Sequence, residues 1–374
     1  MMRLDAREWK AFAVPEIFQN IQRGKRLKNA DHVPGIVPYV SSTANNNGVD
    51  DYIEASAGTR VFKNCISLAN SGSVGTAFYE PFAFVASDHV TSLECKEANE
   101  YIYLFLTAVL EQQGSNFNFN REINDLRIKK MRVMLPVTDG GQPDFQFMED
   151  YVRELMAEKR KQYRTYVEKH LKSLRLDIAN KRGYSEALKS REWKRFNINE
   201  IFVVGHGFYN KKPPMHDNGK YPFIGASGEN NGVTGFTTLK EIDNNSKIGY
   251  GPNEPLERKI YSKGHLCVVN NGSAIGYTYY QPNDFTCTHD VNPLWLRDRD
   301  MDVYLGLFLS QAIRAQGICF TYARKWRPSR MVRSQFMLPV TDDGQPDYDF
   351  MEEFGRKMMA NKYNQYLSYL TQRP

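Results

Sequence analysis

The chain has 374 residues, of which 41% are hydrophobic and 25% are charged. This composition is that of ordinary globular domains and excludes a disordered chain, and the length predicts two or three domains of about 100 to 200 residues each. The net charge of +6 is mild, so a polyanionic partner would require basic groups concentrated on one face.

The first part of the chain reads as a mixed module. Short apolar runs, such as residues 36–40 and 65–69, are separated by Gly, Asn and Pro turns, which is typical of strands. Residues 100–113 then carry apolar side chains at helical spacing. Aromatic residues alternate with polar and basic ones over residues 114–121, and a Leu-Pro-Val-Thr turn follows. These features predict an α+β fold.

A long amphipathic helix is predicted next, from residue 148 to residue 178, and it would extend about 45 Å. One apolar stripe cannot be buried alone, so we expect it to pack against a second helix, at residues 351–370, as an antiparallel coiled-coil spacer. The stripe residues assigned to contacts between these helices and with partner subunits are Met148, Val152, Leu155, Tyr163, Val167, Leu171, Leu174, Phe354, Met358, Tyr366 and Leu370.

The second half of the chain repeats the first. Residues 338–352 echo residues 135–149 almost letter for letter, at an offset of 338 − 135 = 203. The openings of the two modules, at Trp9 and Trp193, are offset by 193 − 9 = 184, so the second module holds extra loop residues, around 244–257. Internal repetition predicts two tandem modules with pseudo-two-fold symmetry. The predicted boundaries are 1–143 for the first module, 144–183 for the first spacer helix, 184–346 for the second module and 347–374 for the second helix.

Both modules carry residues of the types that bind DNA. Arg and Asn form bidentate hydrogen bonds with guanine and adenine, and Lys and Arg neutralise phosphates. The candidates lie in an early cationic loop, an Asn-Gly turn, a Gly-Ser loop and the aromatic and basic segment of each module. They are Lys25, Arg26, Lys28, Ser42, Thr43, Asn45, Asn70, Asn118, Asn120, Arg121, Lys211, Lys212, Ser227, Asn230, Asn270, Tyr322, Arg324, Lys325, Arg327 and Arg330.

Each of these segments also has a structural explanation. The aromatic and basic segment could be an amphipathic edge strand with its aromatics in the core, and each lysine could be solvated only. The Asn-Gly runs are strong turn formers, because Asn and Gly accept positive φ. His89 and His289 lie in matching regions but not at one aligned position, which favours ordinary histidines.

The motifs of a self-sufficient DNA enzyme are missing. An amino-methyltransferase needs an Asn/Asp-Pro-Pro-aromatic motif and a glycine-rich cofactor turn, and neither is present. A nuclease needs clustered carboxylates and a lysine at a magnesium site, and Glu8-x-Lys10 lacks an upstream Pro-Asp. Five cysteines without a Cys-x-x-Cys pair predict reduced thiols and argue against structural zinc. No apolar run reaches membrane-spanning length and no signal peptide is evident, so we expect a soluble, cytoplasmic chain.

The repeat, the long helices and the paired Leu-Pro segments resemble the specificity (S) subunits of Type I and related Type IIB restriction-modification enzymes, over nearly the whole chain. The resemblance implies that residues 8–136 and 192–339 are target-recognition domains, each reading one half of a bipartite, asymmetric site in double-stranded DNA. It also implies that the helices set the gap between the halves and dock the methyltransferase subunits. The Gly-Gln-Pro-Asp-aromatic form at 141–145 and 344–348 is closer to the Type IIB-like branch, where one fused partner carries nuclease and methyltransferase.

The function implied is that of a non-catalytic reader, with no cofactor in this chain. S-adenosylmethionine and Mg²⁺ are expected in partner subunits that methylate adenine and cleave DNA. Two alternatives from other classes are a self-sufficient DNA endonuclease and a bivalent protein-binding scaffold. A scaffold would have no use for the aromatic and basic segments.

Overall fold

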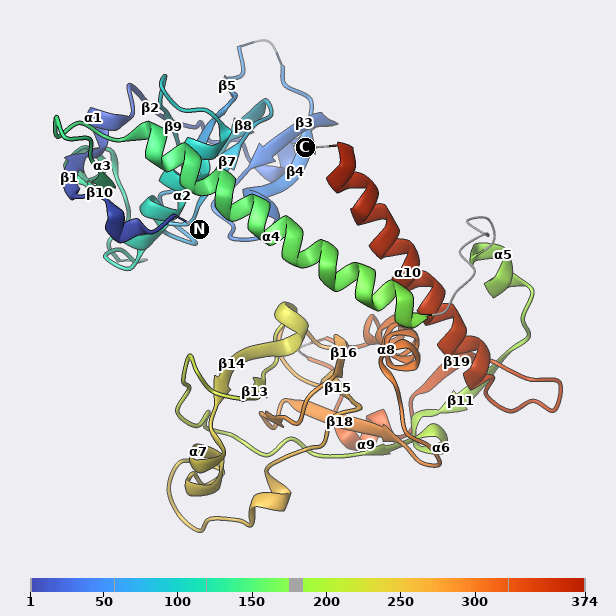
Figure 1. Ribbon diagram of the computed structural model, residues 1–374. Coiled ribbons are helices and arrows are strands. Elements are labelled where there is room, and N and C mark those ends of the chain that lie inside the picture. Colours follow the sequence, from blue (N-terminus) through green and yellow to red (C-terminus); the bar gives the residue numbers. More distant parts are fainter. Residues whose placement is uncertain (1, 57, 119, 175–183, 322, 373–374) are drawn as a thin grey trace. The chain divides into compact units, whose positions relative to one another are not determined.

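A computed structural model describes residues 2–56, 58–118, 120–174, 184–321 and 323–372. The chain divides into two compact units, Met1–Thr165 and Tyr166–Pro374. In Figure 1 the chain can be followed by colour from β1 through the long helix α4 into the second unit. Both units combine helices with sheets, so the predicted α+β class is confirmed.

Three sheets form the first module. One is an antiparallel pair of the first and last strands, β1 (Trp9–Ala13) and β10 (Arg132–Pro136). The second is antiparallel, in the order β2 (Asn20–Arg23), β9 (Val90–Glu94), β6 (Cys65–Ala69) and β7 (Ala77–Glu80). The third has the order β4 (Val49–Ile53), β3 (Pro34–Val40), β8 (Phe84–Ala86) and β5 (Val61–Phe62), and its β3–β8 pair is parallel.

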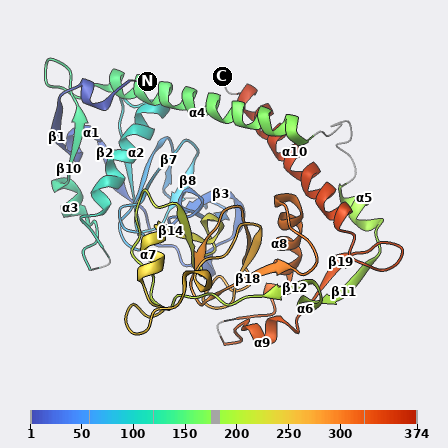
Figure 2. The same ribbon diagram turned by 60° about the horizontal axis from the view of Figure 1, so that its bottom comes forward.

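Helix α2 (Glu100–Gly114) covers the second of these sheets, against β6 and β7, as Figure 2 also shows. It begins after Asn99, whose side chain accepts hydrogen bonds from the backbone N–H groups of Tyr101 and Ile102. The helix predicted at residues 100–113 is therefore confirmed. The remaining helices of the module are α1 (Val14–Ile17), α3 (Asp125–Lys130) and the 3₁₀ turns η1 (Leu4–Ala6), η2 (Asn29–Asp31) and η3 (Asn46–Gly48).

The second module repeats this topology, as the internal repeat predicted, except that its third sheet has three strands in the described residues, with no strand equivalent to β5. Its sheets are β11 (Trp193–Asn197) with β19 (Gln335–Pro339); β12 (Phe202–Val204), β18 (Val291–Leu296), β15 (His265–Val269) and β16 (Thr278–Gln281); and β14 (Val233–Thr237), β13 (Tyr221–Ile224) and β17 (Thr286–Cys287). Its helices are α5 (Tyr184–Lys189), α6 (Ile198–Ile201), α8 (Val303–Gly317), α9 (Pro328–Met331) and the turns η4 (Asn230–Gly232) and η5 (Leu256–Arg258). The β13–β17 pair is parallel, like β3–β8.

The extra residues of the second module form a segment around helix α7 (Leu239–Asn244). Lys259 is fully buried beneath it, and its Nζ donates to the carbonyl oxygens of Ile242 (3.0 Å), Asp243 (2.9 Å) and Asn245 (3.0 Å). These carbonyls lie at the C-terminal end of α7, where helix carbonyls lack partners within the helix and favour a cation. The insertion therefore has its own anchor.

Two long helices follow the modules, α4 (Phe145–Leu174) and α10 (Tyr348–Gln372). Asp144 and Asp347 accept hydrogen bonds from backbone N–H groups in the first turns, at 2.9 and 3.0 Å, so both helices begin three residues before the predicted stripes. Within the second unit, the rings of Tyr166 and His170 of α4 contact Tyr363 of α10. The predicted helix end at Ile178 lies outside the described residues.

A buried carboxyl group distinguishes the first module from the second. Glu80 of β7 is fully buried; Ser67 donates to its Oε1 at 2.9 Å, and its Oε2 has no hydrogen-bond partner within the described residues. Burial raises the pKa of Glu80 to about 7. The strand registers place Gln281 at the equivalent position of the second module, where its Nε2 donates to the Asn231 carbonyl oxygen at 3.1 Å.

Replacing Glu80 with glutamine is expected to stabilise the first module at neutral pH. The pKa of Glu80 in the folded state lies above the usual glutamate value of about 4.3. At a pH between these two pKa values, the folded state binds more protons than the unfolded state, so the free energy of unfolding falls as pH rises from about 5 to about 8. Glu80→Gln removes this loss. The measurement is amide hydrogen exchange of β7 at about pH 5 and about pH 8.

The reverse substitution in the second module, Gln281→Glu, is the matched control. It should introduce the same pH dependence into β16. An unchanged pH profile of β7 exchange in Glu80→Gln would contradict the argument.

Candidate nucleic-acid interface

The loops of the first module meet at a buried asparagine. Asn70, at the end of β6, is fully buried, and its backbone N–H donates to the His89 carbonyl oxygen at 2.8 Å. Its own carbonyl oxygen accepts the N–H of Ile123 at 3.0 Å, and its Oδ1 accepts the Thr91 hydroxyl at 2.8 Å. The Gly-Ser loop after β6, the turn before β9 and the segment after α2 are thereby held together.

Asn270 plays the same part in the second module. Its backbone N–H donates to the Asp290 carbonyl oxygen at 2.8 Å and its carbonyl oxygen accepts the N–H of Trp326 at 3.1 Å. Its side-chain amide donates to Asn292 Oδ1 (2.6 Å) and to the His289 carbonyl oxygen. Of the two candidates predicted to contact DNA, Asn70 is fully buried, and Asn270 is 6% exposed and lines the polar cavity described below.

A pair of glycines brings the aromatic and basic segment against the Gly-Ser loop. A Cβ on Gly75 would lie 2.4 Å from the Cα of Gly114, and a Cβ on Gly276 would lie 2.3 Å from the Cα of Gly317. Gly75 and Gly276 also have φ values of +87° and +86°, which disfavour other residues. Backbone packing at this point therefore positions the segment in both modules.

The aromatic and basic segments are tight turns and not edge strands. Arg121 closes the first by donating its N–H to the Asn118 carbonyl oxygen at 2.8 Å, and Arg324 closes the second through Thr321 at the same distance. Each arginine lies over a ring of its own turn, Phe117 at 5.6 Å and Phe320 at 5.5 Å. The candidates exposed here are Asn118, Asn120, Arg121, Arg324, Arg327 and Arg330; Lys325 is partly exposed and Tyr322 lies outside the described residues.

The early cationic loops lie against the turn between β8 and β9 in the first module and against the end of β17 in the second. The N–H groups of Gly24 and Lys25 donate to the carbonyl oxygens of Val90 (3.0 Å) and Ala86 (3.1 Å). In the second module the N–H groups of Phe208 and Tyr209 donate to the Cys287 carbonyl oxygen. The buried Tyr209 hydroxyl donates a hydrogen bond to the Ile242 carbonyl oxygen at 2.9 Å. Burial raises the pKa of this hydroxyl. The candidates exposed in these loops are Lys25, Arg26, Lys28, Lys211 and Lys212.

The Asn-Gly turns are explained first by backbone geometry. Asn46, Asn47, Asn230 and Asn231 all have positive φ, as the turn interpretation predicted. The candidates beside them keep some exposure: Asn45 and Asn230 are exposed, and Ser42, Thr43 and Ser227 are partly exposed. Thr43 and Ser227 use their hydroxyls to cap their own turns, at 3.2 and 3.1 Å.

The second module contains a polar cavity of about 460 Å³ that the sequence pattern did not indicate. It lies where the cationic loop, the loop after β15, the turn before β18 and the segment before α9 meet. His206 and Lys247 line it with His289. Lys247 belongs to the insertion and has no counterpart in the first module, so repeat matching gave no signal for it.

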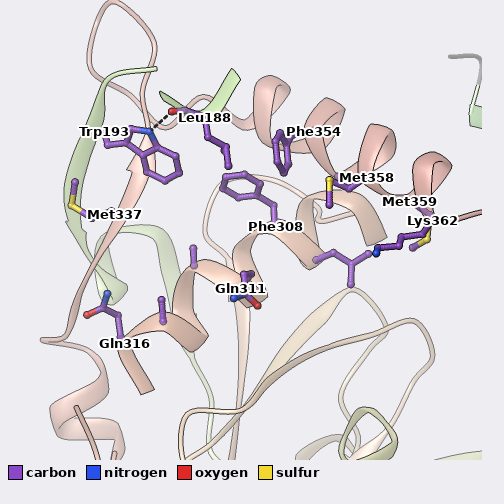
Figure 3. A pocket seen from close by; sticks show the side chains of 14 residues that line it. Leu188, Trp193, Phe308, Gln311, Gln316, Met337, Phe354, Met358, Met359 and Lys362 are labelled. Carbon is purple, nitrogen blue, oxygen red and sulfur yellow. Dashed lines mark hydrogen bonds between the residues drawn. The ribbon is translucent and has the colours of Figure 1, made fainter. Parts of the chain in front are cut away.

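An apolar cavity of about 580 Å³ lies between α8 and α10 of the second unit (Figure 3). Trp193 borders it, donating from Nε1 to the Leu188 carbonyl oxygen at 2.9 Å and stacking on Phe308. The predicted contact residues Phe354 and Met358 line the cavity from α10. This arrangement leaves a cavity bordered mainly by aromatic and methionine side chains.

Several of the predicted helix contacts are buried in this chain. Met148 and Val152, which were predicted to contact partner subunits, belong to the core of the first module. The apolar stripe at the start of α4 serves its own module. Val167, Leu174 and Leu370 are buried as well. Partial or full exposure is kept by Leu155, Tyr163, Leu171, Phe354, Met358 and Tyr366.

Within the described residues, no helix combines the length and the apolar character that crossing a membrane requires. The same residues contain no group of three or more His, Cys, Asp or Glu side chains placed to hold a metal ion. All five cysteines are free.

Comparison with known proteins matches both repeats to one family. The family described as Type I restriction modification DNA specificity domain matches residues 6–163 and again residues 190–366. The chain is 24% identical over 357 residues to the specificity subunit S.BcgI of a Type II restriction enzyme from Heyndrickxia coagulans, covering 94% of each chain.

Solved structures of similar proteins come from two further organisms. The S subunit of a Type I restriction-modification system from M. genitalium is 15% identical, with a TM-score of 0.45, over 99% of this chain and 95% of that one. The HsdS subunit from Thermoanaerobacter tengcongensis is 13% identical, with a TM-score of 0.29, over 97% of this chain and 91% of that one.

Replacing Gly276 with alanine is expected to displace the aromatic and basic segment of the second module. The new Cβ would meet the Gly317 backbone, and we expect destabilisation of about 1 to 3 kcal/mol. Hydrogen exchange should rise over residues 317–327 and stay unchanged over 114–121. Gly251→Ala is the matched control, because Gly251 has a φ of +85° but no atom within 4 Å of its Cβ position. Equal exchange in both variants would show that φ strain alone acts.

Proposed function

The chain belongs to the family of Type I restriction modification DNA specificity domains, and from this membership we propose that its two modules read the two halves of a bipartite, asymmetric site in double-stranded DNA. The family and the relative from Heyndrickxia coagulans are specificity subunits, which are non-catalytic. The chain is thus the DNA-sequence-recognition subunit of a restriction-modification system.

The observation that supports two half-sites is that one loop surface is built twice on one scaffold. The buried asparagines Asn70 and Asn270 and the glycine contacts at Gly75 and Gly276 are the same in both copies. The exposed side chains differ, since Asn118 and Asn120 of the first module are replaced by Thr321 and Ala323. A common scaffold with different polar groups is what reading two unlike half-sites requires.

The partners in this proposal are a methyltransferase for adenine and an endonuclease, which supply S-adenosylmethionine binding and Mg²⁺-dependent cleavage. A single fused partner chain is favoured, because the relative is a subunit of a Type II restriction enzyme and the Gly-Gln-Pro-Asp form occurs twice here. The apolar cavity at Phe354 and Met358 is our proposed docking surface for it. The place of action is the cytoplasm, where five free thiols stay reduced.

Duplex binding by the full chain tests the function. The chain should bind duplex DNA in a salt-sensitive way, because phosphate contacts release counterions, and a pool of random duplexes should be enriched in a two-part sequence. Neither methylation nor cleavage is expected from the isolated chain. Turnover by the isolated chain would support the endonuclease alternative, and absence of duplex binding would support the scaffold.

Within the same assay, Arg324→Ala should relax recognition in the half-site of the second module by about 1 to 3 kcal/mol if the guanidinium contacts a base. Arg121→Ala is the matched variant of the first module and should affect the other half-site. A uniform loss across all sequences would instead assign these arginines to phosphates.

Helix α4 is proposed to set the gap between the half-sites. Insertion of about seven helical residues after Lys159 lengthens α4 by about 10 Å while keeping its apolar face in phase, so the gap should grow by about three base pairs. The same number of residues inserted at the exposed Gly251 loop should leave the gap unchanged. Sequencing the enriched duplexes measures the gap between the half-sites. An unaltered gap in the α4 variant would contradict the proposal that α4 sets it.

A further inference from the structure

The polar cavity of the second module has cationic groups among its lining residues. Lys247 and Arg327 are exposed and come from different segments, the insertion and the start of α9. Lys325 also lines the cavity. Side chains of this type bind phosphate oxygens and fix the register of a protein on a duplex without reading its sequence. These cations are therefore suited to the DNA backbone.

The lining of the cavity also includes an acidic group, Asp290, whose side chain is 26% exposed. Asp290 accepts a hydrogen bond from Asn271 Nδ2 at 2.8 Å, and His289 Nε2 lies 3.4 Å from the same carboxylate oxygen. A carboxylate repels phosphate, so a cavity made only for the backbone would not contain one. A carboxylate does match the exocyclic amino group of cytosine, because that amino group donates a hydrogen bond to it in the major groove. Asp290 is therefore suited to a base edge.

The first module carries the same pair of residue types in the opposite order. The register of the central strands pairs Ala69 with Val90 and Val269 with Val291, so Asp88 corresponds to His289 and His89 to Asp290. This explains why the two histidines do not align with each other. The inversion puts an imidazole where the other module has a carboxylate.

The residue facing this position differs as well. Ser71 hydrogen-bonds through its hydroxyl to His89 Nδ1, whereas Asn271 in the second module bonds to Asp290. The scaffold behind them is the same, because the N–H groups of Asn70 and Asn270 donate to the carbonyl oxygens of His89 and Asp290, both at 2.8 Å. Identical backbone support thus presents a different hydrogen-bonding group in each module.

We propose that these inverted pairs are specificity-determining residues: Asp290, held by Asn271 and flanked by His289, reads an exocyclic amino group in one half-site. His89, held by Ser71 and flanked by Asp88, reads a base in the other half-site, and its imidazole N–H matches an acceptor such as guanine O6 or N7. This inference rests on the proposed function and adds to it the chemistry of one base contact in each half.

The test exchanges the three groups of the second module for those of the first, by Asn271→Ser, His289→Asp and Asp290→His in the full chain. The probe is a pool of random duplexes sequenced after selection by the protein. The preferred base should change by about 10-fold or more at one or two positions in one half-site, and the other half-site should stay the same. An unchanged sequence, or an equal loss at every position, would overturn the inference.

Two single variants guard against misfolding of the triple variant. Asp290→Asn keeps the shape and removes the charge, so it should alter base preference while leaving the salt dependence of binding unchanged. Arg327→Ala should weaken binding to all duplexes and reduce the salt dependence. If Asp290→Asn behaves like Arg327→Ala, the carboxylate does not read a base. If the unmodified chain selects no sequence at all, the proposed function fails, and this inference fails with it.

Discussion

One buried asparagine in each module is the constraint on which the loop surface depends. Asn70 and Asn270 end the central strands β6 and β15, and their backbone groups join the turn before the neighbouring strand to the segment after the helix. A buried backbone donor or acceptor without a partner costs about as much as a lost hydrogen bond, so none of these loops can move away alone. These backbone hydrogen bonds therefore fix the bases of the loops from inside the module.

The duplicated module separates what the fold needs from what it tolerates. Contacts between backbones recur in both copies, as Gly75 on Gly114 and Gly276 on Gly317 show, because no side chain fits between the two chains. Side chains that only fill a buried polar position differ, as Glu80 and Gln281 do. A whole segment can be present in one module alone where its own residues hold it in place. The insertion of the second module is held by Lys259, which donates hydrogen bonds to carbonyl oxygens at the end of α7.

The sequence predicted the repeat, the class of fold and the main helices, because periodicity and repetition report directly on local structure. It did not reveal which polar residues are buried. Asn70 stands in an Asn-Ser-Gly run typical of an exposed turn, and only the strand register shows that its side chain faces inward. The sequence likewise predicted the apolar stripe of α4, but residue spacing alone does not predict that Met148 packs on its own module. The position of Lys247 in the cavity depends on tertiary folding of an insertion without a repeat partner.

Under the proposed function, this construction assigns affinity and selectivity to separate groups. Cations at the loop edges act on any duplex, and their effect is additive and screened by salt, so losing one weakens binding without changing its target. Groups at the loop tips contribute less affinity but distinguish bases, because a mismatched donor or acceptor stays unpaired at the interface. The tips are carried by backbone hydrogen bonds that involve the residues at 89 and 290 only through their carbonyl groups. Side chains at these positions, exchanged together with Ser71 or Asn271, leave these backbone bonds in place, so one fold can present different hydrogen-bonding groups in its two modules.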